Sequence, residues 1–208
     1  MGMSKTFRLT AAAVLLAALS ACIPETDTVA EDVSRSSDKV IIVGAFEITP
    51  KIPQRLNTDQ RMMRPVEESL FGSAEDLVGD RLVTGFLPFG TQVRPSMWGN
   101  PWVGKTHSVP LDDLFFIEVE RTALQMQPGQ FFLSDWGPDS IVLPGGLVTA
   151  THPTADVVYV GTVRYRRDDF FAITDVRVLD RFSQAAAAVR SRYGANTTIA
   201  KSLWRPDR

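Results

Sequence analysis

From residue 39 onward, short hydrophobic runs alternate with glycine, proline and polar turn residues. Runs of this length that are rich in β-branched and aromatic residues predict strands, and many such strands separated by turns predict a sandwich or barrel. We expect strands at 40–48, 81–89, 114–120, 130–134, 140–143, 146–150, 156–165 and 170–179. The predicted fold is therefore mainly β, an antiparallel β-sandwich in a single domain over residues 39–208.

The last two predicted strands form a hairpin with one apolar and one polar face. A four-residue loop, Arg166 to Asp169, would place Tyr165 opposite Phe170. Because side chains alternate between the faces of a strand, one face is mostly apolar. The polar face carries Thr162, Arg164, Asp175 and Arg177. We interpret the hairpin arginines as a charged outer face balanced by aspartates; the alternative is a contact with an acidic partner or lipid headgroups.

One segment has the periodicity of a helix. In residues 180–193, Phe182, Ala186, Val189 and Tyr193 form a single apolar stripe. Neighbouring residues of a strand point to opposite faces, so one member of each adjacent phenylalanine pair needs cover outside the sandwich core. These pairs are Phe115-Phe116, Phe131-Phe132 and Phe170-Phe171. We therefore expect this C-terminal helix to pack on an outer sheet face.

Residues 1–21 have the layout of a secretory signal peptide. Lys5 and Arg8 form a basic start without acidic residues, an apolar run extends from Leu9 to Leu19, and small residues precede Cys22. As a helix, the apolar run would cover about 16 Å, roughly half of the hydrocarbon core of a bilayer. We interpret the segment as a signal that is removed, and not as a membrane span.

The sequence Leu19-Ser20-Ala21-Cys22 resembles the lipobox of bacterial lipoproteins, which ends at the lipidated cysteine. The resemblance implies a diacylglycerol on the Cys22 thiol, cleavage before Cys22 and acylation of the new N-terminus. Several acyl chains, each contributing ~0.8 kcal/mol per buried CH₂, hold a protein firmly at a membrane. A catalytic role for Cys22, the only cysteine, would need a nearby base, and the first histidine of the chain is His107.

The residue after the cysteine bears on which membrane holds the protein. In lipoproteins, an aspartate at that position tends to retain the protein at the inner membrane, whereas this chain has Ile23. The resemblance therefore implies an outer-membrane anchor, and we expect the periplasmic side rather than the cell surface.

Residues 22–38 carry acidic and small polar side chains with few large hydrophobic ones. This composition is typical of disorder, so we expect a flexible tether between the lipid and the domain. The leader contains two of the 22 basic residues and none of the 24 acidic ones, which leaves the mature chain with a net charge of −4. An acidic balance argues against nucleic acid as a partner, since nucleic-acid binding needs a basic surface.

The residues that could carry chemistry do not form a recognisable motif. His107 and His152 stand in short polar segments that predict solvated loops. A hydrolase could use His152 with Asp156 and a serine, but the chain has no G-x-S-x-G elbow. As a metal-binding pair, His152 and Asp156 lack a third ligand at useful spacing, and there is no H-E-x-x-H. We therefore predict no catalytic residue, metal or cofactor.

The strongest candidate for binding is the segment Pro95 to Lys105, "PSMWGNPWVGK", which contains Trp98 and Trp102. The Gly-Asn-Pro break between them prevents a regular element, and loop tryptophans are good contact residues for partners or sugar rings. The alternative is that both tryptophans fold back and close an open end of the sandwich.

The layout is similar to that of cell-envelope lipoproteins with a compact β-sandwich after a short tether. We favour a non-enzymatic interaction or structural module, anchored through lipid on Cys22, with an envelope protein or glycan as partner. The alternative is an envelope hydrolase or glycan-active enzyme with a site built from loops. A concave pocket with two convergent titratable groups would favour the enzyme.

Overall fold

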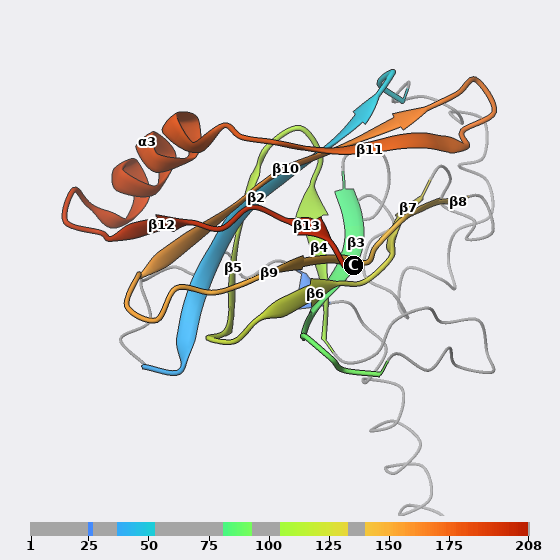
Figure 1. Ribbon diagram of the computed structural model, residues 1–208. Helices are drawn as coiled ribbons and strands as arrows, with labels where there is room; N and C mark the ends of the chain where they lie inside the picture. Colours follow the sequence, from blue (N-terminus) through green and yellow to red (C-terminus); the bar gives the residue numbers. More distant parts are fainter. Residues whose placement is uncertain (1–24, 27–36, 53–80, 93–104, 133–139, 208) are drawn as a thin grey trace, which may run out of the picture.

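The computed structural model describes residues 25–26, 37–52, 81–92, 105–132 and 140–207 (Figure 1). Their strands form two sheets, with one helix near the C-terminal end of the chain. The predicted mainly β sandwich with a C-terminal helix is thus confirmed. Of the predicted tether, the structure describes only residues 25–26, which form a short strand, and 37–38, so the tether stays a prediction.

The first sheet has five strands in the order β11-β10-β2-β5, with β12 also paired to β10. Their bounds are β2 Lys39–Thr49, β5 Leu114–Glu120, β10 Val157–Arg167, β11 Ile173–Leu179 and β12 Ile199–Lys201. β11 pairs with the second half of β10 and β12 with its first half. Most pairs in the two sheets are antiparallel, as expected, but β10 runs parallel to β2 and to β12, so this sheet is mixed.

A bulge at Gly161 divides β10. The register between β10 and β2 shifts between Tyr159 and Gly161, and Gly161 has a φ of 100°. A Cβ at this position would lie 2.7 Å from the Cγ1 atom of Val178, so no larger residue fits without movement. Glycine is therefore needed both for the backbone conformation and for the close packing of β11.

The second sheet has eight strands, ordered β1-β4-β3-β6-β9-β13, with β7 paired to β3 and β8 to β7. Their bounds are β1 Glu25–Thr26, β3 Arg81–Pro88, β4 Thr106–Pro110, β6 Leu124–Met126, β7 Gly129–Phe132, β8 Ser140–Leu143, β9 Leu147–Thr149 and β13 Arg205–Pro206. The sequence did not predict β1, β4, β6 and β13, nor β12 of the other sheet. The expectation of a loop around His107 was wrong, because His107 is buried in β4.

Stacked aromatic rings join the two sheets. Phe46 of β2 lies 5.3 Å from Phe115 of β5, and Phe115 lies 5.7 Å from Phe86 of β3 in the opposite sheet. Phe86 in turn stacks on Trp204, with ring centroids 5.8 Å apart. Rings of this size bury large apolar surfaces and gain further from offset stacking. This row therefore forms a continuous centre for the sandwich core.

The helix α3 (Phe182–Tyr193) covers a second cluster on the outer face of the five-stranded sheet (Figure 1). Its Ala185 and Val189 contribute to this cluster, which also contains Ile41, Val43, Phe116, Val157 and Tyr159. Phe115 belongs to the sandwich core and Phe116 to the helix-covered cluster, so the expected division of this pair is confirmed. For Phe170 the expectation was wrong: it is 89% exposed.

The hairpin of β10 and β11 differs in register from the expectation. Tyr165 pairs with Val176 and not with Phe170, because the turn takes up more residues. The Asp168 carboxylate accepts hydrogen bonds from the backbone N–H groups of Phe170 and Ala172, both at 2.9 Å. These bonds hold the turn residues out of the strand. The shift is an even number of residues, so the predicted division into an apolar and a polar face remains correct.

Candidate functional site

The three site residues predicted from the sequence lie outside the described part of the chain. Cys22 belongs to residues 1–24, and Trp98 and Trp102 belong to residues 93–104. Their roles therefore stay predictions. The structure does describe the chain up to Gln92 and again from Lys105, on either side of the tryptophans, between β3 and β4.

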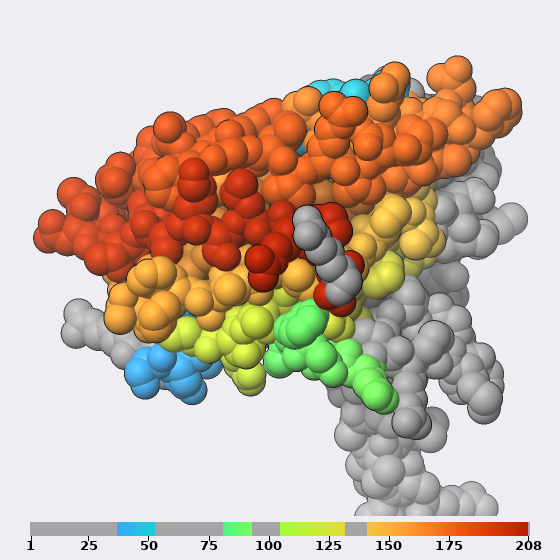
Figure 2. Space-filling model, in the orientation of Figure 1, coloured from blue at the N-terminus to red at the C-terminus, as the bar shows by residue number. Residues whose placement is uncertain are grey.

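A surface groove lies beside the end of β3. It has a volume of about 600 Å³ and is lined by Phe89, Ala123, Val148, Thr149, Ala150, Arg205, Pro206 and Asp207. In Figure 2, the C-terminal residues (red) lie close to the residues at the end of β3 (green) on this face. The groove thus combines parts of the chain that are far apart in the sequence.

Backbone hydrogen bonds hold the walls of the groove. The N–H of Phe89 donates to the carbonyl of Ala123 at 2.7 Å, which fixes the end of β3 beside β6. On the other side, β13 pairs with β9 through Arg205 and Val148, and the N–H of Asp207 donates to Gly146 at 3.2 Å. Residues 205–207 are therefore tied to the second sheet and form a wall.

The lining is suited to binding through an aromatic side chain and a few polar groups. Phe89 remains 50% exposed, and Arg205 is also exposed on the opposite wall. The Thr149 hydroxyl is occupied, since it donates to the Ser202 carbonyl at 2.6 Å. Asp207 supplies the one carboxyl group among the lining residues. The lining thus offers an aromatic surface, a cation and a carboxylate.

Side-chain hydrogen bonds hold the chain that follows Phe89 as far as Thr91. The Gln125 side chain donates from Nε2 to the Thr91 carbonyl at 3.0 Å, and its Oε1 accepts from the Gly90 N–H at 3.4 Å. The Thr91 hydroxyl donates to the Pro88 carbonyl at 2.7 Å. These bonds fix the chain just before the segment that carries Trp98 and Trp102. The groove wall at Phe89 and the tryptophan segment are therefore consecutive in the chain.

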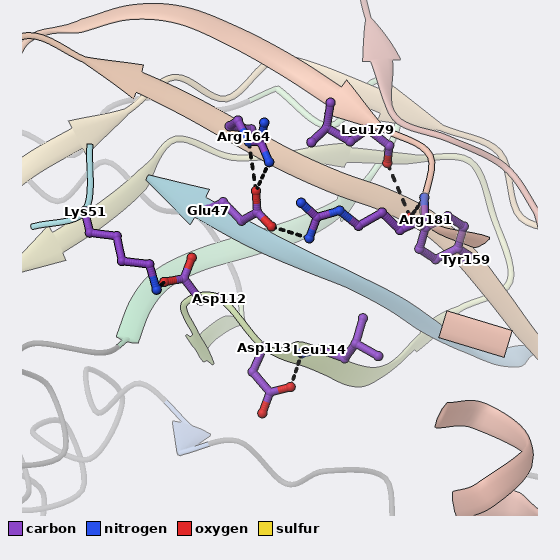
Figure 3. A network of polar contacts seen from close by, with 9 residues as sticks. All are labelled: Glu47, Lys51, Asp112, Asp113, Leu114, Tyr159, Arg164, Leu179 and Arg181. Carbon is purple, nitrogen blue, oxygen red and sulfur yellow. Dashed lines mark hydrogen bonds and ion pairs between the residues drawn. The ribbon is translucent and has the colours of Figure 1, made fainter. Parts of the chain in front are cut away.

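A charged cluster lies on the outer face of the five-stranded sheet (Figure 3). The Glu47 carboxylate, 13% exposed, receives the guanidinium of Arg164 at 2.8 Å and that of Arg181 at 2.5 Å. The Tyr159 hydroxyl accepts from the backbone N–H of Arg181 at 2.7 Å and donates to the Leu179 carbonyl at 3.3 Å. The cluster thus fixes the turn that leads from β11 into α3, which is a structural task.

The arginines of the hairpin are engaged in different ways. Arg164 is balanced by Glu47, a glutamate of β2, and not by a neighbouring aspartate as expected. Arg167 donates to the carbonyls of Pro50, Lys51 and Asp168, and its guanidinium lies 4.6 Å from the centre of the Phe171 ring. Arg177 pairs with Asp175 at 2.6 Å. Of these three arginines, the expected balance by an aspartate is found for Arg177, whereas Arg164 pairs with a glutamate and Arg167 with carbonyl groups and a ring.

The residues considered for catalysis or metal binding serve local structure. His107 is 7% exposed, and its ring lies 5.9 Å from that of Phe86. Asp156 accepts from the N–H and the hydroxyl of Thr198, at 2.8 and 2.7 Å. His152 is exposed and accepts from the N–H of Thr154 at 3.3 Å. Among the described residues, no group of three His, Cys, Asp or Glu side chains could hold a metal ion.

The shifted pKa values also arise in structural contacts. A hydrogen bond from Lys201, followed by one from the Phe182 N–H, lowers the pKa of Asp180. Burial raises the pKa of Tyr165, whose hydroxyl donates to the Pro144 carbonyl at 3.1 Å. Hydrogen bonds to Glu118 and Asp112 raise the pKa of Lys39 and of Lys51, respectively. None of these side chains lines the groove.

Comparisons with known proteins give no relative: no protein family, curated protein or solved structure matches the chain. In the part of the chain that the structure describes, no helix has the length and hydrophobicity to cross a membrane.

Proposed function

We propose that this chain is a lipid-anchored protein of the bacterial cell envelope, and that its β-sandwich is a non-enzymatic binding module. The proposal for the anchor rests on the leader sequence, which has a basic start, an apolar run and Leu19-Ser20-Ala21-Cys22 in the order found in lipoproteins. Lipid on Cys22 would hold the domain at the outer membrane, on its periplasmic side.

The proposal for binding is supported by one observation, the groove lined by Phe89 and Arg205, whose Phe89 stands a few residues before the tryptophan segment in the sequence. The exposed ring of Phe89 lies on one wall, and the chain from there leads to Trp98 and Trp102. Aromatic side chains on loops held by a rigid scaffold dominate many binding surfaces, and arginine is the other residue enriched there. Arg205 supplies that cation on the opposite wall. The partner that fits is an envelope protein or glycan.

Crosslinking in intact cells, followed by affinity capture of the full chain, tests this function. We expect Phe89→Ala and the double change Trp98→Ala/Trp102→Ala each to weaken capture of the partner, because both remove aromatic contact area. Val142→Ala is the matched control, since Val142 is 60% exposed on β8 and does not line the groove.

The melting temperature of each purified variant completes the test. If Phe89, Trp98 and Trp102 contact the partner, their variants capture less of it and keep nearly the melting temperature of the parent. If the tryptophan variant melts many degrees lower, Trp98 and Trp102 are core residues, and the proposal that they bind the partner is wrong. If capture is unchanged for both variants, the groove is not the binding site.

A further inference from the structure

β11 is an edge strand of seven residues. Within the described part of the chain it pairs only with β10, and its other edge has no backbone partner (Figure 1). An unpaired edge presents N–H and C=O groups that can pair with another strand. The sequence of β11 indicates which strand could pair with this edge.

The charges of β11 are arranged symmetrically about Val176. Asp175 and Arg177 flank this residue and lie on the outer face, because neighbours alternate between faces. In an antiparallel pair of two β11 strands with a two-fold axis at Val176, Asp175 of each copy lies opposite Arg177 of the other. Opposite charges at directly paired positions stabilise a sheet, so the strand is complementary to itself.

The surroundings of Arg177 favour a further carboxylate. Arg177 is in register with Arg164 of β10, which places two like charges at opposite positions. Arg164 is balanced by Glu47, whereas Arg177 has Asp175 of its own strand as its acidic partner. The Arg177 side chain is 70% exposed and therefore accessible to a second copy.

The ends of β11 are consistent with the same axis. Phe170, which is 89% exposed, precedes β11, and Phe182 follows it at the start of α3. These two residues stand at equal distances from Val176 in the sequence. Phe170 and Phe182 therefore stand beyond opposite ends of β11, and the two-fold axis places Phe170 of one copy at the same end of the strand pair as the start of α3 in the other.

We propose that β11 pairs antiparallel with β11 of a second copy, with the two-fold axis at Val176, so that the two five-stranded sheets become one continuous sheet.

Disulfide trapping of the full chain in whole cells tests the axis. In an antiparallel pair the Cα atoms at the axis are about 4.5–5.5 Å apart, within reach of a disulfide, whereas those of Thr174 are about 14 Å apart. We expect at least about tenfold more linked dimer from Val176→Cys than from Thr174→Cys, because disulfide geometry excludes the second pair.

The parent chain, which keeps Cys22, gives the background. A membrane-permeable oxidant is added to the cells, because a reducing cytosol would otherwise keep the cysteines from forming a disulfide. With the oxidant present, the outcome is separate from that of the proposed lipid anchor. Equal trapping of Val176→Cys and Thr174→Cys overturns the proposed axis.

Exchange of charges between two chains tests the pairing itself. In the Val176→Cys background, Arg177→Asp alone and Asp175→Arg alone each place like charges opposite one another, and we expect each to lose the linked dimer. Co-expressed with different tags, the two variants become complementary to each other, so the mixed dimer should return.

If Asp175 and Arg177 only formed an ion pair within one chain, the mixed dimer would not return. Each variant chain lacks that ion pair, and the other chain cannot supply it. If the mixed dimer does not return while both variants keep the melting temperature of the parent, the interface is wrong. If either single variant melts at a lower temperature than the parent, the double change Asp175→Arg/Arg177→Asp in one chain replaces it in the test. The double variant again has opposite charges within the chain and across the proposed interface, so it should form the linked dimer.

Discussion

Glu47 receives two guanidinium groups at once, those of Arg164 and Arg181, while only 13% of its side chain is exposed. A partly buried carboxylate needs such partners, because an unpaired charge away from water is costly. Both arginines remain 39% exposed, so they keep part of their hydration. At the scale of single residues, this cluster connects β2, β10 and the start of α3.

Glu47→Gln should therefore lower the free energy of unfolding by about 1–3 kcal/mol, because both guanidinium groups lose a charged acceptor. Urea denaturation of the purified variant measures this loss. Glu118→Gln is the matched control, since Glu118 pairs with Lys39 on the surface, at side-chain exposures of 31% and 48%. Exposed pairs contribute about 0–1 kcal/mol. Equal midpoints for the two variants would contradict the structural role of Glu47.

At the scale of elements, α3 depends on the sheet beneath it. The helix has no side-chain cap at Arg181, although the Asp180 carboxylate accepts from the Phe182 N–H at 3.0 Å. Isolated helices of this length are marginal in water, so the stability of α3 comes from its packed face. Val189, which is fully buried, lies at the centre of that face.

Val189→Ala should lower the free energy of unfolding by about 2 kcal/mol, because it removes buried methyl groups and leaves a cavity. The same substitution at Val142, which is 60% exposed, should change it by less than about 0.5 kcal/mol. Thermal or urea unfolding compares the two. If Val189→Ala and Val142→Ala have the same free energy of unfolding, the packing of α3 does not contribute to the stability of the domain.

The sequence predicted the long elements of this domain well, because their signals are local. The runs 40–48 and 114–120 became β2 and β5, and the apolar stripe of residues 180–193 became α3. It did not predict the short strands β6, β12 and β13, since two or three residues carry too little pattern and their partners are distant in the chain. The parallel pairing of β2 with β10 was also not predicted, because the two strands are far apart in the chain.

At the scale of the whole molecule, the C-terminal residues join the two sheets. β12 pairs with β10 in one sheet and β13 with β9 in the other, and between them Trp204 is buried in the core. The backbone N–H of Trp204 donates to the Val160 carbonyl at 2.8 Å. This arrangement also builds a wall of the groove. The sequence could not predict the groove, because its lining comes from the residue after β3, from β9 and from β13, which meet only in the folded chain.

At the same scale, we propose that a lipid on Cys22 holds this sandwich at a membrane. In the chain purified from membranes, trypsin should release an N-terminal peptide from Cys22 to Arg35, since Arg35 is the first basic residue after the cysteine. Mass spectrometry of that peptide is the most direct measurement. The account predicts a peptide that begins at Cys22 and carries the mass of a diacylglycerol and an N-terminal acyl chain. A peptide from Leu9 to Arg35 with an unmodified Cys22 would contradict it.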